Sequence, residues 1–198
     1  NEILRDREHS TVRLVMHPDK MVIGEEMRTF TYLNLYGYLT DAVIVNRVFP
    51  SQVGDYFAGW RQVQEQNLEL VRSAFSPVPV LCAPYFEQEV VGPEMLDRLA
   101  SAVFSEADRD PTEVLHSSLT QELEVSEDGA RLRLALPFAS KGDISLKKIG
   151  LELVVGVDGQ RRTIMLPSAL ASFRPAGATF EDGALEVIFD GAEQHAGR

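Results

Sequence analysis

Hydrophobic residues recur with two different periods along the first half of the chain. Short apolar runs typical of buried strands alternate with stretches at helical spacing, so that strands are expected at residues 11–17, 42–48 and 78–83 and helices at residues 19–36, 52–75 and 93–104. Gly37 is expected to end the first of these helices. Such alternation predicts an α/β fold, in which parallel strands are connected by helices that cover the sheet.

The second half of the chain has a different pattern. Residues 105–128 are acidic and polar, and beyond them short alternating runs are separated by Lys-Gly-Asp and Asp-Gly turns. Short strands at this spacing predict a small all-β sandwich. We therefore expect an α/β domain over residues 1–106, an acidic linker over 107–129, and a sandwich over 130–190 that folds on its own.

Composition and charge narrow the classes of partner. The 198 residues are 44% hydrophobic, which suffices for one large core and a second small one. The formal net charge of −11 argues against nucleic acid and anionic membrane surfaces, because both are bound chiefly through Lys and Arg. With one cysteine, no signal-peptide pattern and no long apolar stretch, we expect a cytoplasmic protein with at most peripheral membrane contact through a partner.

One strand pattern carries a polar residue near its end, in the stretch AVIVNRVFP. This residue is Asn46, and ligands of parallel sheets gather where the strands end. The chain contains no Gly-Lys pair, so it lacks the glycine-rich loop that holds phosphates and magnesium in many nucleotide-binding enzymes. These features predict half of a nucleotide site. Because the chain also begins with Asn1 rather than methionine, we expect it to be a piece of a longer protein.

Four stretches of the first half resemble, in the same order, the second half of the arsenical pump-driving ATPase family, which includes the ATPases that deliver tail-anchored membrane proteins. These stretches are LVMHP, EEMR, TYLNLYGYLTDAVIVNRVFP and APYFEQEVVG. The resemblance covers nearly all of residues 1–104. It implies that residues 1–106 are the C-terminal half of a P-loop-type ATPase domain.

The resemblance also implies an adenine site. In the family, the asparagine of the VIVN strand and the proline-led loop after the next strand hold the base, which here indicates Asn46, Pro84 and Phe86, with Tyr85 as a further candidate. An amide offers the base both a donor and an acceptor, and the other side chains offer apolar faces. The alternative is that Asn46 only satisfies the strand end and Phe86 packs in the core.

Further expectations follow from the same resemblance. The bound nucleotide would be ATP, with magnesium held by an N-terminal ATPase segment that these residues do not contain, and this chain alone is not expected to bind a cofactor tightly. The parent protein would be a homodimer that nucleotide closes. No catalytic residue and no metal ligand are expected within this chain. The zinc-type Cys-x-x-Cys of the tail-anchored targeting members is absent from the sequence, which argues against structural zinc.

Residues 130–189 resemble the small heat-shock, or alpha-crystallin, domain that is appended to bacterial members of this ATPase family. The resembling stretches are LALPFASKGDISLKKIGLELVVGVDGQRRTIMLP and GATFEDGALEVIF. They imply an alpha-crystallin-type sandwich. The chain lacks the Ile-x-Ile/Val tail through which free small heat-shock proteins assemble, so large chaperone oligomers are not expected.

Other candidate side chains have simpler interpretations. Cys82 is expected to fill a core position, and the four histidines lack the spacing of metal ligands. Arg161 and Arg162 are expected to be solvated charges at a sheet edge, and the alternative is that one of them binds a phosphate, since adjacent strand residues face opposite ways. Glu25 and Arg28 either orient the first helix or form a surface ion pair of little energetic worth.

The second long helix carries an apolar stripe. Its members are Val53, Phe57, Trp60 and Val63. Packing against the sheet is the expected role of such a stripe, and binding the apolar helix of a client protein is the alternative.

Two functions remain for the chain as a whole. The first is the C-terminal portion of an ATP-binding, ATP-hydrolysing enzyme of anion-transport or membrane-protein-targeting type, which supplies the adenine side of the site but not the phosphate loop. The second is a non-enzymatic, chaperone-like module that holds apolar segments of other proteins on its β-sandwich and binds no nucleotide.

Overall fold

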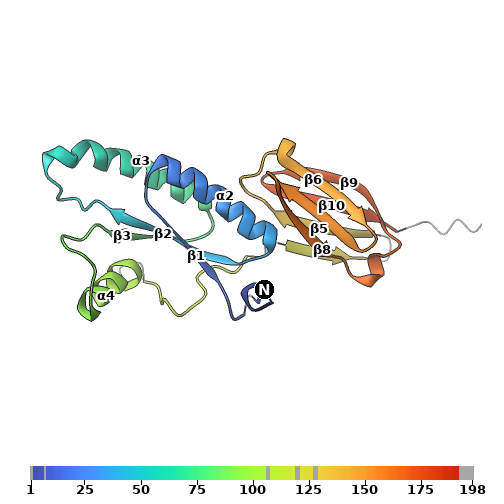
Figure 1. The fold of residues 1–198 in the computed structure, drawn as a ribbon, viewed down its shortest axis with the longest axis horizontal. Coiled ribbons are helices and arrows are strands. Elements are labelled where there is room, and N and C mark those ends of the chain that lie inside the picture. Colours follow the sequence, from blue (N-terminus) through green and yellow to red (C-terminus); the bar gives the residue numbers. More distant parts are fainter. Residues whose placement is uncertain (1, 7, 106–107, 119–120, 127–128, 192–198) are drawn as a thin grey trace, which may run out of the picture. The chain divides into compact units, whose positions relative to one another are not determined.

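The computed structural model describes residues 2–6, 8–105, 108–118, 121–126 and 129–191 (Figure 1). Its contacts divide the chain into two units, and each unit draws on two separate stretches of sequence. Unit 1 contains Asn1–Phe30 and Leu39–Ser118, and unit 2 contains Thr31–Tyr38 and Leu119–Arg198.

Unit 1 is built on a three-stranded parallel sheet in the order β1–β2–β3. The strands are β1 (Val12–Met16), β2 (Thr40–Val48) and β3 (Val80–Pro84). Val43 and Val45 of β2 are fully buried, and Ile44 between them packs with Leu81 and Ala83 in the cluster on the other face. A strand buried on both faces needs a continuous apolar run, which is why this stretch of sequence does not alternate.

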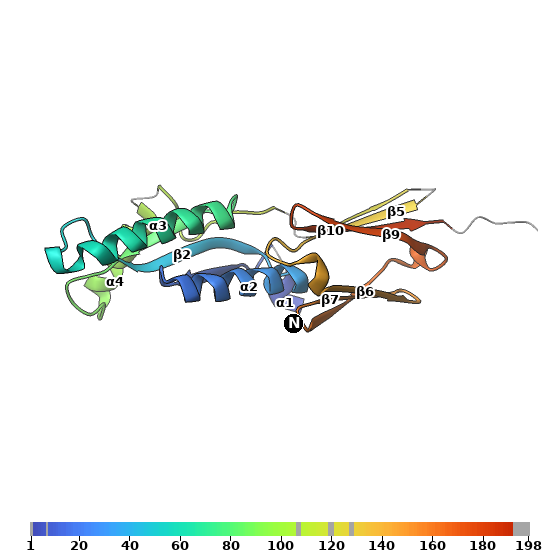
Figure 2. The ribbon, with the colours of Figure 1, turned by 90° about the horizontal axis from the view of Figure 1, so that it is seen from above.

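The helices of unit 1 cover both faces of its sheet, with α3 over one face and α4 over the other (Figures 1 and 2). The α-helices of the described residues are α1 (Glu2–Arg5), α2 (Lys20–Tyr36), α3 (Ala58–Phe75) and α4 (Pro93–Ala100). Short 3₁₀ turns lie at Asp55–Phe57, Lys141–Asp143 and Ser168–Leu170, and a π-helical turn lies at Ser101–Ser105. The expected helix over residues 52–75 therefore starts later than predicted. Gly54 has an extended backbone and precedes the 3₁₀ turn, so the regular helix begins only at Ala58.

Helix α2 ends at the glycine that the sequence indicates. Gly37 has φ 80°, its N–H donates to the carbonyl of Asn34, and the N–H of Tyr38 donates to the carbonyl of Leu33. These two bonds close the helix in a Schellman motif, which needs a left-handed residue that glycine adopts without strain.

Residues 108–118 stay with unit 1 because a buried ion pair holds them there. Asp41 of β2 is fully buried and accepts two hydrogen bonds of 3.2 Å from Arg13 of β1. The same guanidinium donates to the carbonyls of Pro111 and Glu113, and the N–H of Leu115 donates to the Asp41 carboxylate. The first part of the expected linker is thus fixed to the sheet by one charged pair.

Unit 2 consists mainly of two antiparallel sheets, in the orders β4–β5–β10–β9 and β6–β7–β8. The strands are β4 (Gln121–Val125), β5 (Gly129–Ala135), β6 (Ile144–Ile149), β7 (Glu152–Val157), β8 (Gln160–Met165), β9 (Arg174–Glu181) and β10 (Ala184–Asp190). Strand β4 lies inside the stretch that the sequence indicated as linker. The predicted fold class, a parallel α/β half followed by an all-β sandwich, is confirmed.

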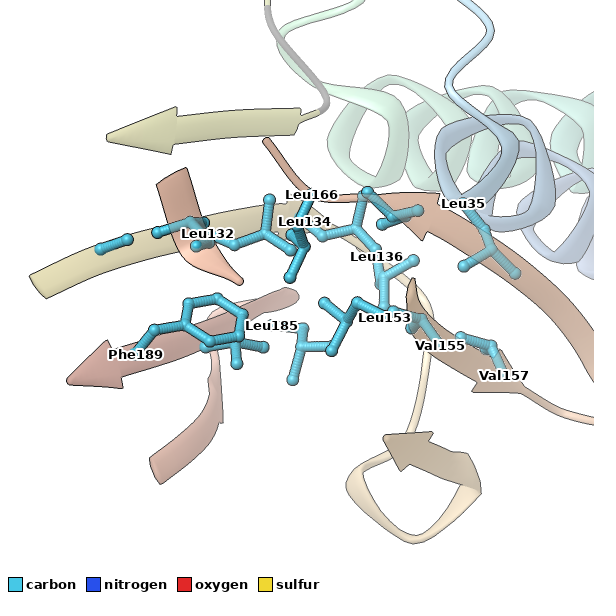
Figure 3. Close-up of a cluster of buried hydrophobic side chains, with 14 residues drawn as sticks. Leu35, Leu132, Leu134, Leu136, Leu153, Val155, Val157, Leu166, Leu185 and Phe189 are labelled. Carbon is cyan, nitrogen blue, oxygen red and sulfur yellow. The ribbon is translucent and has the colours of Figure 1, made fainter. Parts of the chain in front are cut away.

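The core of unit 2 lies between its two sheets (Figure 3). Alternate residues of β5, β7 and β10 point into it, as the period of a half-exposed strand requires. The labelled members of this cluster are Leu35, Leu132, Leu134, Leu136, Leu153, Val155, Val157, Leu166, Leu185 and Phe189. Leu35 comes from the last turns of α2 and is fully buried. The sandwich core therefore includes a residue from the first fifth of the chain.

Polar groups hold the same turns of α2 in unit 2. The hydroxyl of Tyr32 donates to the carboxylate of Asp158, and the hydroxyl of Tyr36 lies 3.1 Å from Oε1 of Gln160. Arg162 donates to the carbonyl of Leu35, where a cation also favours the negative end of the helix dipole. The expectation that Arg162 is a solvated edge charge is wrong, because this half-buried side chain caps a helix.

Within the described residues, no helix combines the length and the hydrophobicity needed to cross a membrane.

Candidate functional site

The end of β2 departs from regular pairing at Asn46. Val45 pairs with Cys82 and Val48 pairs with Pro84, so two residues of β2 stand opposite the single residue Ala83 of β3. This irregularity is a β-bulge, a feature that often re-aims a side chain beside a functional site. The sequence pattern gave no sign of it.

The bulge holds its two residues in a defined arrangement. Arg47 has φ 59°, a left-handed conformation that is uncommon for a long side chain. Its backbone N–H donates to Oδ1 of Asn46 over 2.9 Å. The expected alternative role of Asn46, satisfying the strand end, is thus present in the structure, while its Nδ2 group has no hydrogen bond among those described.

The loop after β3 brings aromatic side chains to the same edge. The N–H of Tyr85 donates to the carbonyl of Val48, which continues the pairing of the two strand ends. The Tyr85 ring lies 5.9 Å from the Phe49 ring, centroid to centroid. Phe86 is half-buried, and the guanidinium of Arg98 lies 5.7 Å from its ring centroid, a distance suited to a cation–π contact.

A cavity of about 670 Å³, open to solvent on one side, lies at the two strand ends. All four residues singled out from the sequence line it, namely Asn46, Pro84, Tyr85 and Phe86, together with Arg47, Leu99 and the loop residues 87–91. Glu87 and Glu89 of the loop bring negative charge to the cavity, and Arg47 of the bulge brings positive charge. Arg47 and Leu99 were not predicted. A strand pattern does not mark which residue forms a bulge. Leu99 belongs to α4, more than fifty residues after Asn46 in the sequence, so local patterns do not relate the two.

Cys82 of β3 pairs with Val45, in the last regular pair before the bulge. Its side chain is half-buried, and burial raises the pKa of its thiol above the usual value, while the nearby Arg72 guanidinium acts in the opposite direction. A thiol with a raised pKa is a weak nucleophile near neutral pH. Among the described residues, no three His, Cys, Asp or Glu side chains are grouped so that they could hold a metal ion.

The apolar stripe on α3 is not packed as the sequence led us to expect. Phe57, Trp60 and Val63 are exposed by 41%, 59% and 47%, and the buried side chains of α3 belong to its second half. Tyr56 and Phe57 continue the ring contacts from Phe49. The 3₁₀ turn and the first turn of α3 therefore present aromatic side chains at the surface of unit 1, namely Tyr56, Phe57 and Trp60.

Glu25 and Arg28 form an ion pair on the surface of α2. Their side chains lie 3.4 Å apart, and both are more than half exposed. Such a pair contributes little to stability.

The chain is thus an α/β protein whose parallel sheet has a ligand-sized cavity at its strand ends, followed by an antiparallel β-sandwich. A family model described as an anion-transporting ATPase matches residues 1–105, and the chain belongs to this family. A second model, described as an HSP20-like domain found in ArsA, matches residues 127–189.

Similar proteins match over nearly the whole chain. A protein of Chlorobaculum tepidum named "Putative arsenical pump-driving ATPase" is 37% identical over 96% of this chain and 46% of its own length. A protein of Aquifex aeolicus named "Putative arsenical pump-driving ATPase 1" is 35% identical over 91% of this chain and 46% of its own length. The chain thus spans about half the length of the curated relatives it matches.

Among solved structures, HSP18.5 from E. histolytica is 16% identical, with a TM-score of 0.33 over 39% of this chain and 91% of that chain.

Proposed function

We propose that this chain supplies the adenine side of the ATP site in an ATP-hydrolysing enzyme of the anion-transporting ATPase family. The observation that supports this most is that Asn46, Pro84, Tyr85 and Phe86, from the ends of two neighbouring parallel strands, line one cavity. Its volume of 670 Å³ lies within the range of small-ligand sites. Ligands of parallel sheets bind at this end of the strands.

The amide of Asn46 is suited to adenine rather than guanine. Adenine presents its 6-amino donor beside a ring acceptor, whereas guanine presents an oxygen acceptor beside an N–H donor. An amide can match either pattern if it is free to flip. Here Oδ1 already accepts the N–H of Arg47, and a flipped amide would place two donors against each other. The fixed amide therefore offers Nδ2 to the ring nitrogen and the second lone pair of Oδ1 to the 6-amino group.

The apolar contacts come from the loop after β3. We assign Phe86 and Pro84 to the faces of the base, with Tyr85 at the rim because it is 51% exposed. The guanidinium over Phe86 fixes the position of this ring, so that it does not have to be ordered when the base binds.

The phosphates and magnesium would be held by a segment that is not among these 198 residues. The chain has no Gly-Lys phosphate loop, so we expect it to release no phosphate from ATP by itself, at a detection limit far below about 1 per second. In the whole protein, ATP hydrolysis would drive closure of a homodimer, in the service of anion transport or membrane-protein targeting.

A second candidate function is protein binding by a chaperone-like module. The HSP20-like match and the exposed Phe57, Trp60 and Val63 favour it. This function requires no nucleotide site, so it predicts that adenosine does not perturb residues around the cavity.

Replacing Asn46 with Ala in the full-length protein tests the adenine assignment. We expect ATP binding to weaken by about 1 to 3 kcal/mol, because polar atoms of the base would stay buried and unpaired, and selectivity over GTP should fall with it. ATP and GTP affinities and the melting temperature are measured together, with the exposed Gln62→Ala as the control. A lower melting temperature with unchanged selectivity would retire the assignment.

A further inference from the structure

The bulge at the end of β2 is held from behind by a residue of α3. Oε1 of Gln64 accepts the N–H of Phe49 over 2.9 Å, and Nε2 of Gln64 donates to the carbonyl of Arg47 over 3.3 Å. One amide side chain therefore satisfies two backbone groups on either side of Val48. The pairing with the β3 side uses neither of these groups, because the carbonyl of Val48 between them accepts the N–H of Tyr85. Strand β1 does not reach them either, since its last pair is Met16 with Val45.

Gln64 does not belong to the cavity at the strand ends. It lines a different hollow, of 360 Å³, between the end of β2 and α3, together with Phe49, Arg61 and Leu68. Leu68 lies one helical turn further along and is buried, so this side of α3 is anchored on the sheet. Gln64 is thus a fixed support that reaches the candidate site only through the backbone of residues 47–49.

The conformation that Gln64 supports is one that needs support. Arg47 is left-handed, and a non-glycine residue keeps this conformation only where its surroundings impose it. The backbone N–H of Arg47 is also the group that fixes the amide of Asn46. The chain of contacts therefore runs from Gln64 to the Arg47 peptide and from there to the side chain of Asn46.

We propose that Gln64 is a positioning residue for purine selectivity at the candidate nucleotide site. By holding the bulge, it keeps the Arg47 N–H directed at Oδ1 of Asn46, so that this amide presents one fixed edge to a 6-aminopurine. The proposal rests on the proposed function. Its geometric part, that Gln64 orders the bulge, holds without any ligand.

The side-chain chemistry of Gln64 makes the proposal specific. Glutamine is needed because one bond uses its oxygen as acceptor and the other uses its amino group as donor. Gln64→Met keeps the length of the side chain and removes both bonds. Gln64→Glu keeps an acceptor for the Phe49 N–H but brings a carboxylate against the carbonyl of Arg47. Gln62→Met, on an exposed position of the same helix, is the matched control.

The experiment is titration of the ¹⁵N-labelled 198-residue chain with adenosine and with guanosine, followed by amide NMR shifts. We expect the wild type and Gln62→Met to prefer adenosine, with amide shifts around Asn46 and at Tyr85 and Phe86. In Gln64→Met, adenosine binding should weaken by about three- to tenfold, the effect of losing roughly one hydrogen bond, and the preference over guanosine should disappear. Gln64→Glu should lose the preference as well.

Hydrogen exchange of the Phe49 amide, measured without nucleoside, separates the possible failures. The positioning role predicts faster exchange at Phe49 in Gln64→Met and unchanged exchange in the core of β2. A folded Gln64→Met that keeps its adenosine preference overturns the proposal. If adenosine causes no amide shifts in the wild type, the proposed function is overturned. In that case, slower exchange at Phe49 in the wild type than in Gln64→Met still supports the role of Gln64 in ordering the bulge. If Gln64→Met does not fold, Gln64→Glu decides by the same two measurements.

Discussion

The same unusual backbone conformation occurs in both units, for different reasons. In unit 2, Asp158 and Asp182 have φ of 46° and 49°, and each is followed by a left-handed glycine. These are hairpin turns of the type that Asp-Gly pairs favour. In unit 1, the left-handed residue of the strand-end bulge is Arg47, which no turn requires. The two Asp-Gly pairs therefore reverse the chain in the sandwich, whereas Arg47 shapes a cavity wall in the α/β unit.

The two units also differ in what their interiors contain. The core of unit 2 is a continuous apolar cluster, whereas unit 1 buries the carboxylate of Asp41 against Arg13. Removing an apolar group from the first kind of interior leaves a cavity, and removing one charge from the second leaves its partner uncompensated. Substitutions in each unit can test this difference, if the amide NMR signals of each unit are followed separately against urea.

The largest effect is expected from Asp41→Ala. It leaves the partly buried guanidinium of Arg13 without its carboxylate and the N–H of Leu115 without its acceptor, which should lower the free energy of unfolding of unit 1 by about 3 to 5 kcal/mol. Urea titration followed by amide signals measures the change, with the exposed Asp55→Ala as control. If the free energy of unfolding falls by less than about 1 kcal/mol, the Arg13–Asp41 pair contributes no more than an exposed ion pair. The expected difference between the interiors of the two units would then be wrong.

Leu35→Ala should act on the other unit. The side chain is fully buried in the sandwich cluster, so its truncation should destabilise unit 2 by about 2 to 4 kcal/mol. The half-exposed Leu70→Ala on α3 serves as control. Signals of β5, β7 and β10 are the readout. If they keep their urea midpoint while those of β1 to β3 shift, Leu35 supports the α/β unit and the assignment of residues 31–38 is wrong.

Gly183→Ala tests the hairpin turns. Gly183 has φ 70°, and an added Cβ would lie 2.8 Å from Cα of Pro137, so the substitution should lower the stability of unit 2 by about 2 kcal/mol. Gly142→Ala is the control, because a Cβ there meets nothing within 4 Å. Equal stability of the two variants would show that the Asp182-Gly183 turn adjusts at no cost.

Arg47→Gly should have the smallest effect and the opposite sign. Glycine adopts the left-handed conformation of residue 47 without strain, which stabilises the folded state. Glycine also gives the unfolded chain more conformational freedom, which offsets part of this gain, so we expect unit 1 to become more stable by about 0.5 kcal/mol. Arg47→Ala keeps the strain and should bring no gain, which isolates the backbone term. If both variants lower the stability equally, the arginine side chain, not its backbone, determines the stability of the bulge.

Sequence patterns captured the local part of this structure. The parallel α/β half, the sandwich, the glycine that ends α2 and the Asp-Gly turns all follow from periods and residue types within a few positions. The four residues expected around a base do line one cavity, while their binding of adenine stays a prediction, as do the domain boundaries.

What the sequence did not reveal depends on residues far apart in the chain. The bulge at Arg47 is visible only against the register of β3, and the role of Gln64 only once α3 lies beside the end of β2. Arg162 was taken for a solvated charge because its acceptor, the carbonyl of Leu35, lies 127 residues away. The stripe at Trp60 was expected to be packed because helical spacing says which residues share a face but not what that face meets.

The membership of Leu35 in the sandwich core bears on the order in which the protein is made. During synthesis, residues 31–38 leave the ribosome long before strands β5, β7 and β10 exist, so this turn of helix must wait for its partners. The core of unit 2 can then be completed only by packing against a segment that was synthesised earlier. Complete folding of unit 2 therefore requires that the end of α2 has already formed.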